Sequence, residues 1–232
     1  MFYLDPTYIV FMLPAFLIMA AANWWVSSTY KRWGQTRNSV GMNGQDAAQR
    51  LLAHAMLPGV QVAAAQGRLG DNYDPRTKQL HLSPEVAGVP SVASLAITAH
   101  EIGHAMQDRD GYAPLRIRTA LAPATQIGST LGWILILIGF VLGIFELALV
   151  GVVVFSIGAV FALATLPVEF NASARARQLL TDSGLLYTEE ERRGVGSMLN
   201  AAAFTYVAAL IVAVLNVLRF AFMLAGFGRR RN

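Results

Sequence analysis

The sequence predicts a mainly α-helical membrane protein, with several membrane-spanning helices and a polar lobe that contains a small antiparallel β-hairpin or sheet. Hydrophobic residues make up 55% of the 232 residues and charged residues only 14%, whereas soluble domains carry about 25% charged residues. The apolar residues come in long blocks instead of the scatter of a soluble core. The absence of cysteine excludes a disulfide-stapled module and a thiolate zinc ribbon.

The first apolar block, Tyr8 to Val26, is a run of 19 residues without charge. At a rise of about 1.5 Å per residue, it is long enough to cross a hydrocarbon core of about 30 Å. A cleavable signal peptide is the alternative. However, the residues before the run include Asp5 and no lysine or arginine, the opposite of a basic signal-peptide start. We therefore expect residues 1–30 to form a retained N-terminal membrane anchor.

The second block, Ile127 to Ala164, is long enough for two spans and contains Glu146 as its one charge. A carboxylate in the middle of the bilayer is costly, whereas one at a turn is solvated. We therefore expect a transmembrane helical hairpin over residues 127–166, with Glu146 at its turn.

The last block, Ala201 to Phe227, contains Asn216 and Arg219. An arginine inside a span is costly unless its side chain reaches the interface or finds a partner. We expect a C-terminal membrane helix and basic tail over residues 201–232.

Four spans place both polar segments on one side of the membrane and both termini on the other. Basic residues next to the membrane are more numerous on the side of the polar segments. The positive-inside rule therefore predicts a multi-pass protein of the cell (inner) membrane with these segments in the cytoplasm, although the arginines at 229–231 argue the other way. The net charge of +4 fits a lipid membrane as partner, and we expect no nucleic acid.

The polar segment 31–126 has the pattern of a small lobe. Residues 45–56 have the apolar spacing of an amphipathic helix. The alternation in Val60–Val62 and again in Lys78–Leu82 predicts two strands of an antiparallel hairpin or meander, with a turn at Asp74–Thr77 before the second strand. We expect the edge of strand 78–82 to bind an extended peptide.

Residues 91–107 predict a helix that begins at the capping residue Ser91 and carries an HExxH motif. Residues four apart lie on one helix face, so His100 and His104 can both reach one metal ion. Glu101 can then approach the ion's open position and take a proton from water. This pattern predicts a zincin-like lobe, because zinc is commonly bound by such imidazole pairs. Two buried, hydrogen-bonded histidines are the alternative.

A catalytic zinc normally has a third protein ligand. Asp110 stands where the HExxHxxGxxH pattern needs a histidine, which excludes that arrangement. Glu169 is the best candidate, because a carboxylate among apolar residues is costly unless it is paired or bound to metal. We expect residues 167–200 to form a helical segment that carries this third zinc ligand, with Pro167 in its first turn. An exposed glutamate near a helix start is the alternative for Glu169. We expect Glu189–Glu191 to be a solvated charge run.

Several motifs along nearly the whole chain resemble one known family. They are Asn72–Arg76, Leu82–Pro84, HEIGHA at His100–Ala105, LPVEFNAS at Leu166–Ser173, and the segments Leu199–Ala203 and Thr205–Ala208. Together they resemble the bacterial membrane-bound neutral zinc metallopeptidases, the YugP-like group. The resemblance implies that His100, His104 and Glu169 bind one zinc ion per chain, and that Glu101 is general base and acid.

The expected function is that of a membrane-bound zinc-dependent endopeptidase that acts on a protein or peptide substrate. Tyr206 is a catalytic candidate that could stabilise the developing oxyanion, although an interfacial tyrosine is equally consistent with its position. An intramembrane metalloprotease and a non-catalytic metal-binding membrane scaffold are the alternatives. The sequence leaves membrane-protein partners and a homo-oligomer open.

Overall fold

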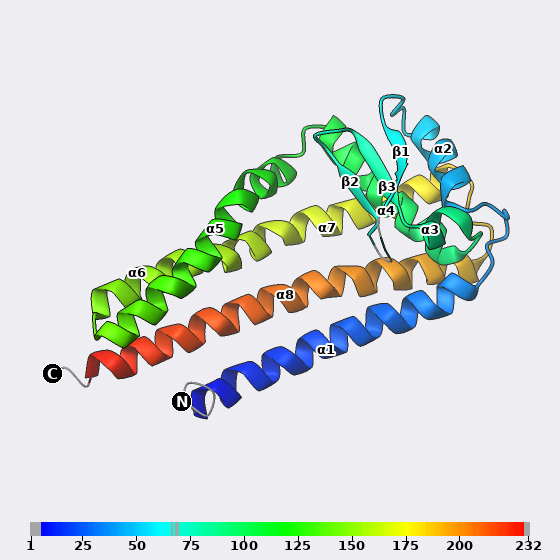
Figure 1. Ribbon diagram of the computed structural model, residues 1–232. Coiled ribbons are helices and arrows are strands. Elements are labelled where there is room, and N and C mark those ends of the chain that lie inside the picture. The colour runs from blue at the N-terminus through cyan, green and yellow to red at the C-terminus, as the bar shows by residue number, and fades with distance from the viewer. Residues whose placement is uncertain (1–5, 66, 68–69, 230–232) are drawn as a thin grey trace. The chain divides into compact units, whose positions relative to one another are not determined.

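The computed structural model describes residues 6–65, 67 and 70–229. Within these residues the chain is mainly helical and contains one small sheet (Figure 1). The helices are α1 (Pro6–Gln35), α2 (Gly44–His54), α3 (Pro84–Gly88), α4 (Val92–Arg109), α5 (Ala113–Leu142), α6 (Phe145–Phe155), α7 (Ile157–Asp182) and α8 (Glu189–Arg229). The strands are β1 (Gln61–Ala64), β2 (Asn72–Asp74) and β3 (Gln79–Leu82).

The chain divides into two compact units. The first, called the membrane unit here, comprises Met1–Ala22, Arg116–Leu166 and Thr205–Asn232. The second, called the lobe unit, comprises Asn23–Leu115 and Pro167–Phe204.

The helices confirm the prediction of four apolar spans. Among the described residues, the candidate spans are Thr7–Gln35, Ala113–Leu142, Phe145–Asp182 and Glu189–Gly226, each long and apolar enough to cross a bilayer. The hairpin turn lies at Gly143, whose φ of +72° is a backbone conformation that glycine adopts without steric cost. Glu146 lies in the first turn of α6, at this connection and not in the middle of a span.

Small residues bring α5 and α6 into close contact in the membrane unit. A Cβ atom at Gly132 would lie 2.9 Å from the carbonyl oxygen of Gly151, and one at Gly139 would lie 2.5 Å from the amide nitrogen of Ala148. Backbones pack this closely between membrane helices only where side chains are small.

The prediction that Pro167 begins a new helical segment is wrong. Helix α7 runs without a break from Ile157 to Asp182 with Pro167 inside it. Proline removes one helical hydrogen bond, but helices of membrane proteins tolerate this where neighbouring groups satisfy the freed carbonyl. The apolar stretch and the segment that carries Glu169 therefore belong to one continuous helix.

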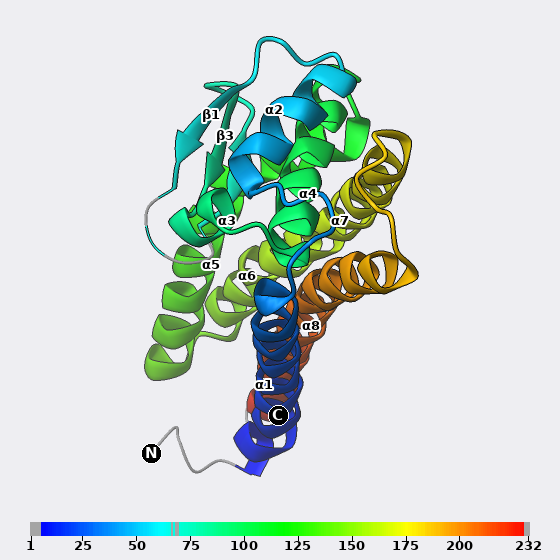
Figure 2. The ribbon, with the colours of Figure 1, turned by 90° about the vertical axis from the view of Figure 1, so that its right-hand side faces the viewer.

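The lobe unit is built around α4. Its N-terminus is capped as predicted, because the Ser91 hydroxyl accepts a hydrogen bond from the amide of Ser94 at 3.0 Å. Leu95, Ile102 and Ala99 of α4 are fully buried in a core that also includes residues of α2, α7 and the sheet. Figure 2 shows α2, α4 and the strands gathered in this unit.

The predicted antiparallel pairing of the first and last strands is wrong. The strand order is β1-β3-β2, and β1 pairs with β3 in parallel. The antiparallel hairpin instead joins β2 to β3, with the predicted turn at Asp74–Thr77 between them. Strand β2 is the antiparallel neighbour of β3. It has only three residues, too few to show an alternation of apolar and polar residues in the sequence. Strand β3 is thus central, and its edge is not free to bind a peptide.

The predicted solvated run at Glu189–Glu191 holds only in part. Glu191 is 3% exposed. Its carboxylate accepts hydrogen bonds from the amides of Thr188 and Ser39, and the Thr188 hydroxyl accepts one from the amide of Glu191. This reciprocal pair is a capping box at the start of α8.

Candidate metal centre

Two helices supply the side chains of the candidate metal centre. His100, Glu101 and His104 lie on α4, and Glu169 lies on α7. Between the two histidines, Gly103 brings the helices together, since a Cβ atom there would lie 2.6 Å from the carbonyl oxygen of Ala172. Any larger residue would push the imidazoles of α4 away from the carboxylate of α7.

The three predicted ligands converge. Nε2 of His100 lies 3.2 Å from Oε2 of Glu169, and Nε2 of His104 lies 3.5 Å from the same oxygen. One donor atom from each of the three residues falls within 4.8 Å of the others. The side chain of Glu169 is 1% exposed, so its charge needs a cationic partner. Two imidazoles and one carboxylate match the donor set of a catalytic zinc site.

Gln107 orients the imidazole of His104. The Gln107 side chain is fully buried, and its Nε2 donates hydrogen bonds to the carbonyl of Val168 at 2.8 Å and to Oδ1 of Asn171 at 3.0 Å. This fixes the amide so that its oxygen faces Nδ1 of His104, 3.0 Å away. Nδ1 must then carry the proton, which leaves the Nε2 lone pair free for a metal ion.

Ser173 lies beside the corresponding nitrogen of His100 and can accept its proton, although a hydroxyl can also donate. Its hydroxyl lies 3.3 Å from Nδ1 of His100. Because Nε2 of His100 faces Glu169, a proton on Nδ1 shared with the hydroxyl leaves Nε2 available as a ligand. The contact is longer and weaker than the one that Gln107 makes.

Strand β2 holds the carboxylate of Glu101. The amide of Tyr73 donates a hydrogen bond to Oε2 of Glu101 at 3.1 Å. Burial raises the pKa of the Glu101 carboxyl, and the neighbouring His100 and His104 oppose this rise without cancelling it. A raised pKa brings a carboxylate closer to the range in which it both accepts and returns a proton near neutral pH.

The side chain of Tyr73 anchors the strand to α4. Its hydroxyl donates a hydrogen bond to Oδ2 of Asp108 at 2.6 Å, and Lys78 of the β2–β3 turn forms an ion pair with the same carboxylate. Glu101 and Asp108 are seven residues apart and lie on one face of the helix. Tyr73 therefore spans two turns of α4, with its amide at one end and its hydroxyl at the other.

Tyr206 belongs to a different unit from the three predicted ligands, which lie in the lobe unit. It lies on α8 in the membrane unit, where its side chain is partly buried. Its role in catalysis stays a prediction.

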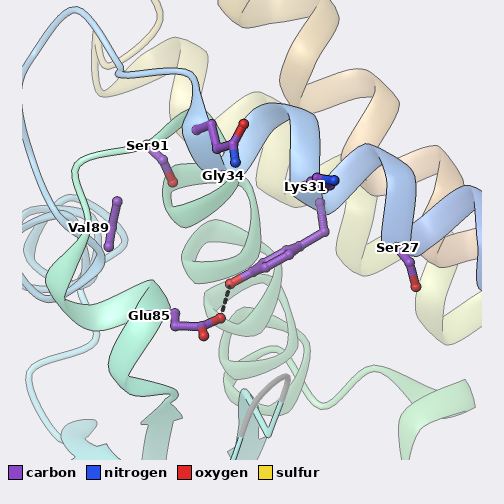
Figure 3. Close-up of a pocket in the computed structure, with 8 residues that line it drawn as sticks. Ser27, Lys31, Gly34, Glu85, Val89 and Ser91 are labelled. Carbon is purple, nitrogen blue, oxygen red and sulfur yellow. Dashed lines mark hydrogen bonds between the residues drawn. The ribbon is translucent and has the colours of Figure 1, made fainter.

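A separate cavity of about 710 Å³ lies elsewhere in the lobe unit. It is bordered by the end of α1 and by the segment that leads into α4, and its lining includes Ser27, Lys31 and Ser91. Across it the hydroxyl of Tyr30 donates a hydrogen bond to Glu85 at 3.1 Å (Figure 3). Neither histidine of the metal centre nor Glu169 lines this cavity.

The sequence pattern misses Gln107, Gly103 and Tyr73. Gln107 follows His104 by three residues, a helical spacing that places it beside the imidazole and could have indicated its role. Gly103 inside a helix could have indicated a close backbone approach. No pattern could have indicated Tyr73, because its contact with Glu101 is made by the backbone.

Comparison with known proteins identifies a matching family and a relative of this chain. The family described as "Putative neutral zinc metallopeptidase" matches residues 8–225. The chain is 37% identical over 227 residues to "Putative membrane protease YugP" of Bacillus subtilis (strain 168), an alignment that covers 95% of this chain and 100% of that protein. No solved structure matches the chain. The two matches confirm the resemblance seen in the motifs, and the chain belongs to the "Putative neutral zinc metallopeptidase" family.

Proposed function

We propose that this protein is a membrane-bound zinc-dependent endopeptidase whose zinc ligands are His100, His104 and Glu169. The observation that carries the proposal is the convergence of two imidazole nitrogens on one buried carboxylate oxygen, within 3.5 Å. Glu101, one residue after the first histidine, adds the general base that peptide hydrolysis needs. A purely structural metal site has no need of such an acidic neighbour.

Zinc bound there would act as a Lewis acid toward a water molecule and toward the carbonyl of the bond to be cut. Glu101 accepts the proton of the attacking water and then delivers it to the leaving amine. The Tyr73 amide holds one carboxylate oxygen of Glu101, which leaves the other oxygen for the water. Gln107 keeps the imidazole of His104 in the protonation state that binds metal, and the Ser173 hydroxyl can accept the Nδ1 proton of His100. Tyr206 is proposed as a donor to the oxyanion.

The edge of β2 is the best candidate to hold the substrate backbone. It is an edge strand of the sheet, and its residue Tyr73 contacts Glu101. A peptide that added to this edge as a further strand would place its main chain next to the general base. Main-chain pairing alone would select extended, unstructured substrates and not a particular sequence.

The chemistry is proposed to take place outside the bilayer, in the cytoplasm. Helix α4 is 18 residues long and carries charged residues in its last turns. It is not one of the four candidate spans found among the described residues. This favours chemistry in the lobe unit, at the membrane surface, over an intramembrane metalloprotease.

The test is hydrolysis of an unstructured protein such as casein by the full-length enzyme in detergent, with metal content measured in parallel. We expect the wild type to cut in a zinc-dependent manner and Glu101→Gln to lose at least about 99% of the rate, in line with the usual contribution of general-base catalysis. Glu101→Gln should retain its zinc. If wild type binds zinc yet cuts none of a broad peptide set, the protein is a metal-binding scaffold instead.

A further inference from the structure

The membrane unit contains a cavity of about 330 Å³ between α1, α5 and α8. Arg219 of α8 is its charged residue, and the other walls are aromatic or aliphatic. These walls include Tyr8, Trp133, Ile136, Phe140, Phe220 and Met223. The cavity therefore combines one cation with surfaces that suit hydrocarbon.

The guanidinium of Arg219 has aromatic neighbours but no anion in the described part of the chain. Its central carbon lies 4.8 Å from the ring centre of Tyr8 and 5.2 Å from that of Phe220. Its Nε atom is buried and makes no hydrogen bond within the described residues. A buried charged donor without an acceptor is costly, so this geometry favours binding of an anionic acceptor from outside the chain.

The membrane unit itself offers few carboxylates to Arg219. Its sequence contains Asp5, which lies outside the described residues, and Glu146. A Cβ atom at Gly228 would lie 3.3 Å from the ring of Phe145, so the start of α6 is level with Gly228. Gly228 is nine residues beyond Arg219, or about 13 Å along the helix. The start of α6, where Glu146 lies, is therefore about two and a half helical turns from Arg219 along α8.

The Arg219 side chain extends toward the end of the unit where α1 begins and α8 ends. The rings of Phe11 and Phe222 are 6.2 Å apart, which sets an antiparallel register between α1 and α8. In this register Tyr8 lies opposite residues beyond Phe222, closer to the end of α8 than Arg219 is. To contact Tyr8, the guanidinium must reach in that direction, as long basic side chains do to approach headgroup level.

We propose that this cavity binds an anionic phospholipid, with the lipid phosphate on the Arg219 guanidinium and the upper part of an acyl chain along the apolar walls. A planar guanidinium binds phosphate through paired hydrogen bonds. Basic pockets between spans are typical sites for anionic headgroups. Tyr8, in the first turn of α1, adds an aromatic group of the kind that favours the interfacial region.

The test is native mass spectrometry of the full-length protein, stripped of lipid and then offered phosphatidylglycerol or phosphatidylcholine with identical acyl chains. We expect the wild type to retain phosphatidylglycerol about tenfold more strongly, the scale of a hydrogen bond to a charged group. Arg219→Gln should abolish this preference. Arg116→Gln, which removes the same charge from α5 outside the cavity, should leave the preference unchanged.

Further variants separate loss of the site from loss of the fold. Arg219→Lys keeps the charge without the planar fork and should retain a weaker preference. Met223→Trp fills the cavity but keeps Arg219, and it should abolish the preference for phosphatidylglycerol. Equal retention of the two lipids by the wild type would overturn the proposal. Unchanged retention by Arg219→Gln would overturn it too, as would a bound inorganic phosphate that excludes the lipid.

Discussion

The side-chain oxygen of Gln107 lies 3.0 Å from Nδ1 of His104, and the amide nitrogen of the same glutamine is bound to α7. One buried side chain thus sets the proton position of a proposed ligand and joins the two helices that carry the metal site. Removal of this side chain should lower the metal affinity more than it lowers the stability of the fold.

We predict that Gln107→Ala weakens zinc binding about 10- to 100-fold, as is usual when the partner of a metal-binding histidine is lost. Zinc affinity can be measured by competition with a chelator. Gln107→Glu should recover part of the affinity, because its carboxylate still accepts the proton of Nδ1. Gln178→Ala, which removes an exposed glutamine of α7, is the control. Equal zinc affinity in Gln107→Ala and wild type would contradict the positioning role.

Gly103→Ala should lower both stability and zinc occupancy. The added methyl group would meet the carbonyl of Ala172 at 2.6 Å, and that backbone cannot yield without moving α7. Overpacking of this kind typically costs about 1–3 kcal/mol. Gly196→Ala is the matched control, because nothing lies within 4 Å of the new Cβ atom. Thermal unfolding and zinc content of both variants, measured side by side, check the prediction; a Gly103→Ala protein as stable and as metal-rich as wild type would refute the close approach.

Tyr73→Phe should destabilise the lobe by about 1–2 kcal/mol at neutral pH, since it removes a hydrogen bond to the Asp108 carboxylate. It should also lower kcat, because the strand that positions Glu101 loses its anchor. Tyr187→Phe, at an exposed tyrosine, is the control. A Tyr73→Phe variant as stable and as active as wild type would remove the anchoring role.

The hydrogen bond between Tyr73 and Asp108 also predicts that the stability of the lobe depends on pH in the alkaline range. Burial raises the pKa of Tyr73 above its ordinary value of 10.0, and the hydrogen bond and charge of Asp108 raise it further. A tyrosine whose pKa is higher in the folded state contributes its full stability below pH 10 and loses it as pH rises toward the folded value. The stability difference between wild type and Tyr73→Phe should therefore be constant near neutrality and shrink above pH 10 in unfolding experiments. A difference that widens there would contradict the sign of the shift.

The sequence predicts the elements that depend on composition and helical spacing. The apolar blocks, the turn at Glu146 and the helix capped by Ser91 all follow from local pattern, and the structure contains each of them. HExxH places two imidazoles on one helix face in the same way. The apolar surroundings of Glu169 favour it as a partner, because burial of a lone carboxylate is costly.

The remaining features depend on contacts between distant segments. Parallel pairing of β1 with β3 depends on how the intervening chain returns, which residue alternation does not encode. The continuity of α7 through Pro167 depends on its surroundings, which outweigh the local preference of proline. The burial of Glu191 depends on the amide of Ser39, which lies 152 positions away in the chain.

Metal analysis of the purified full-length protein tests the central claim most directly. The account predicts about one zinc per chain in the wild type and in Glu101→Gln, little zinc in Glu169→Ala, and a wild-type level in the control Glu189→Ala on the exposed start of α8. Helix content by circular dichroism should be the same in all four proteins. Full zinc occupancy in Glu169→Ala, or no stoichiometric metal in the wild type, would contradict the proposed site.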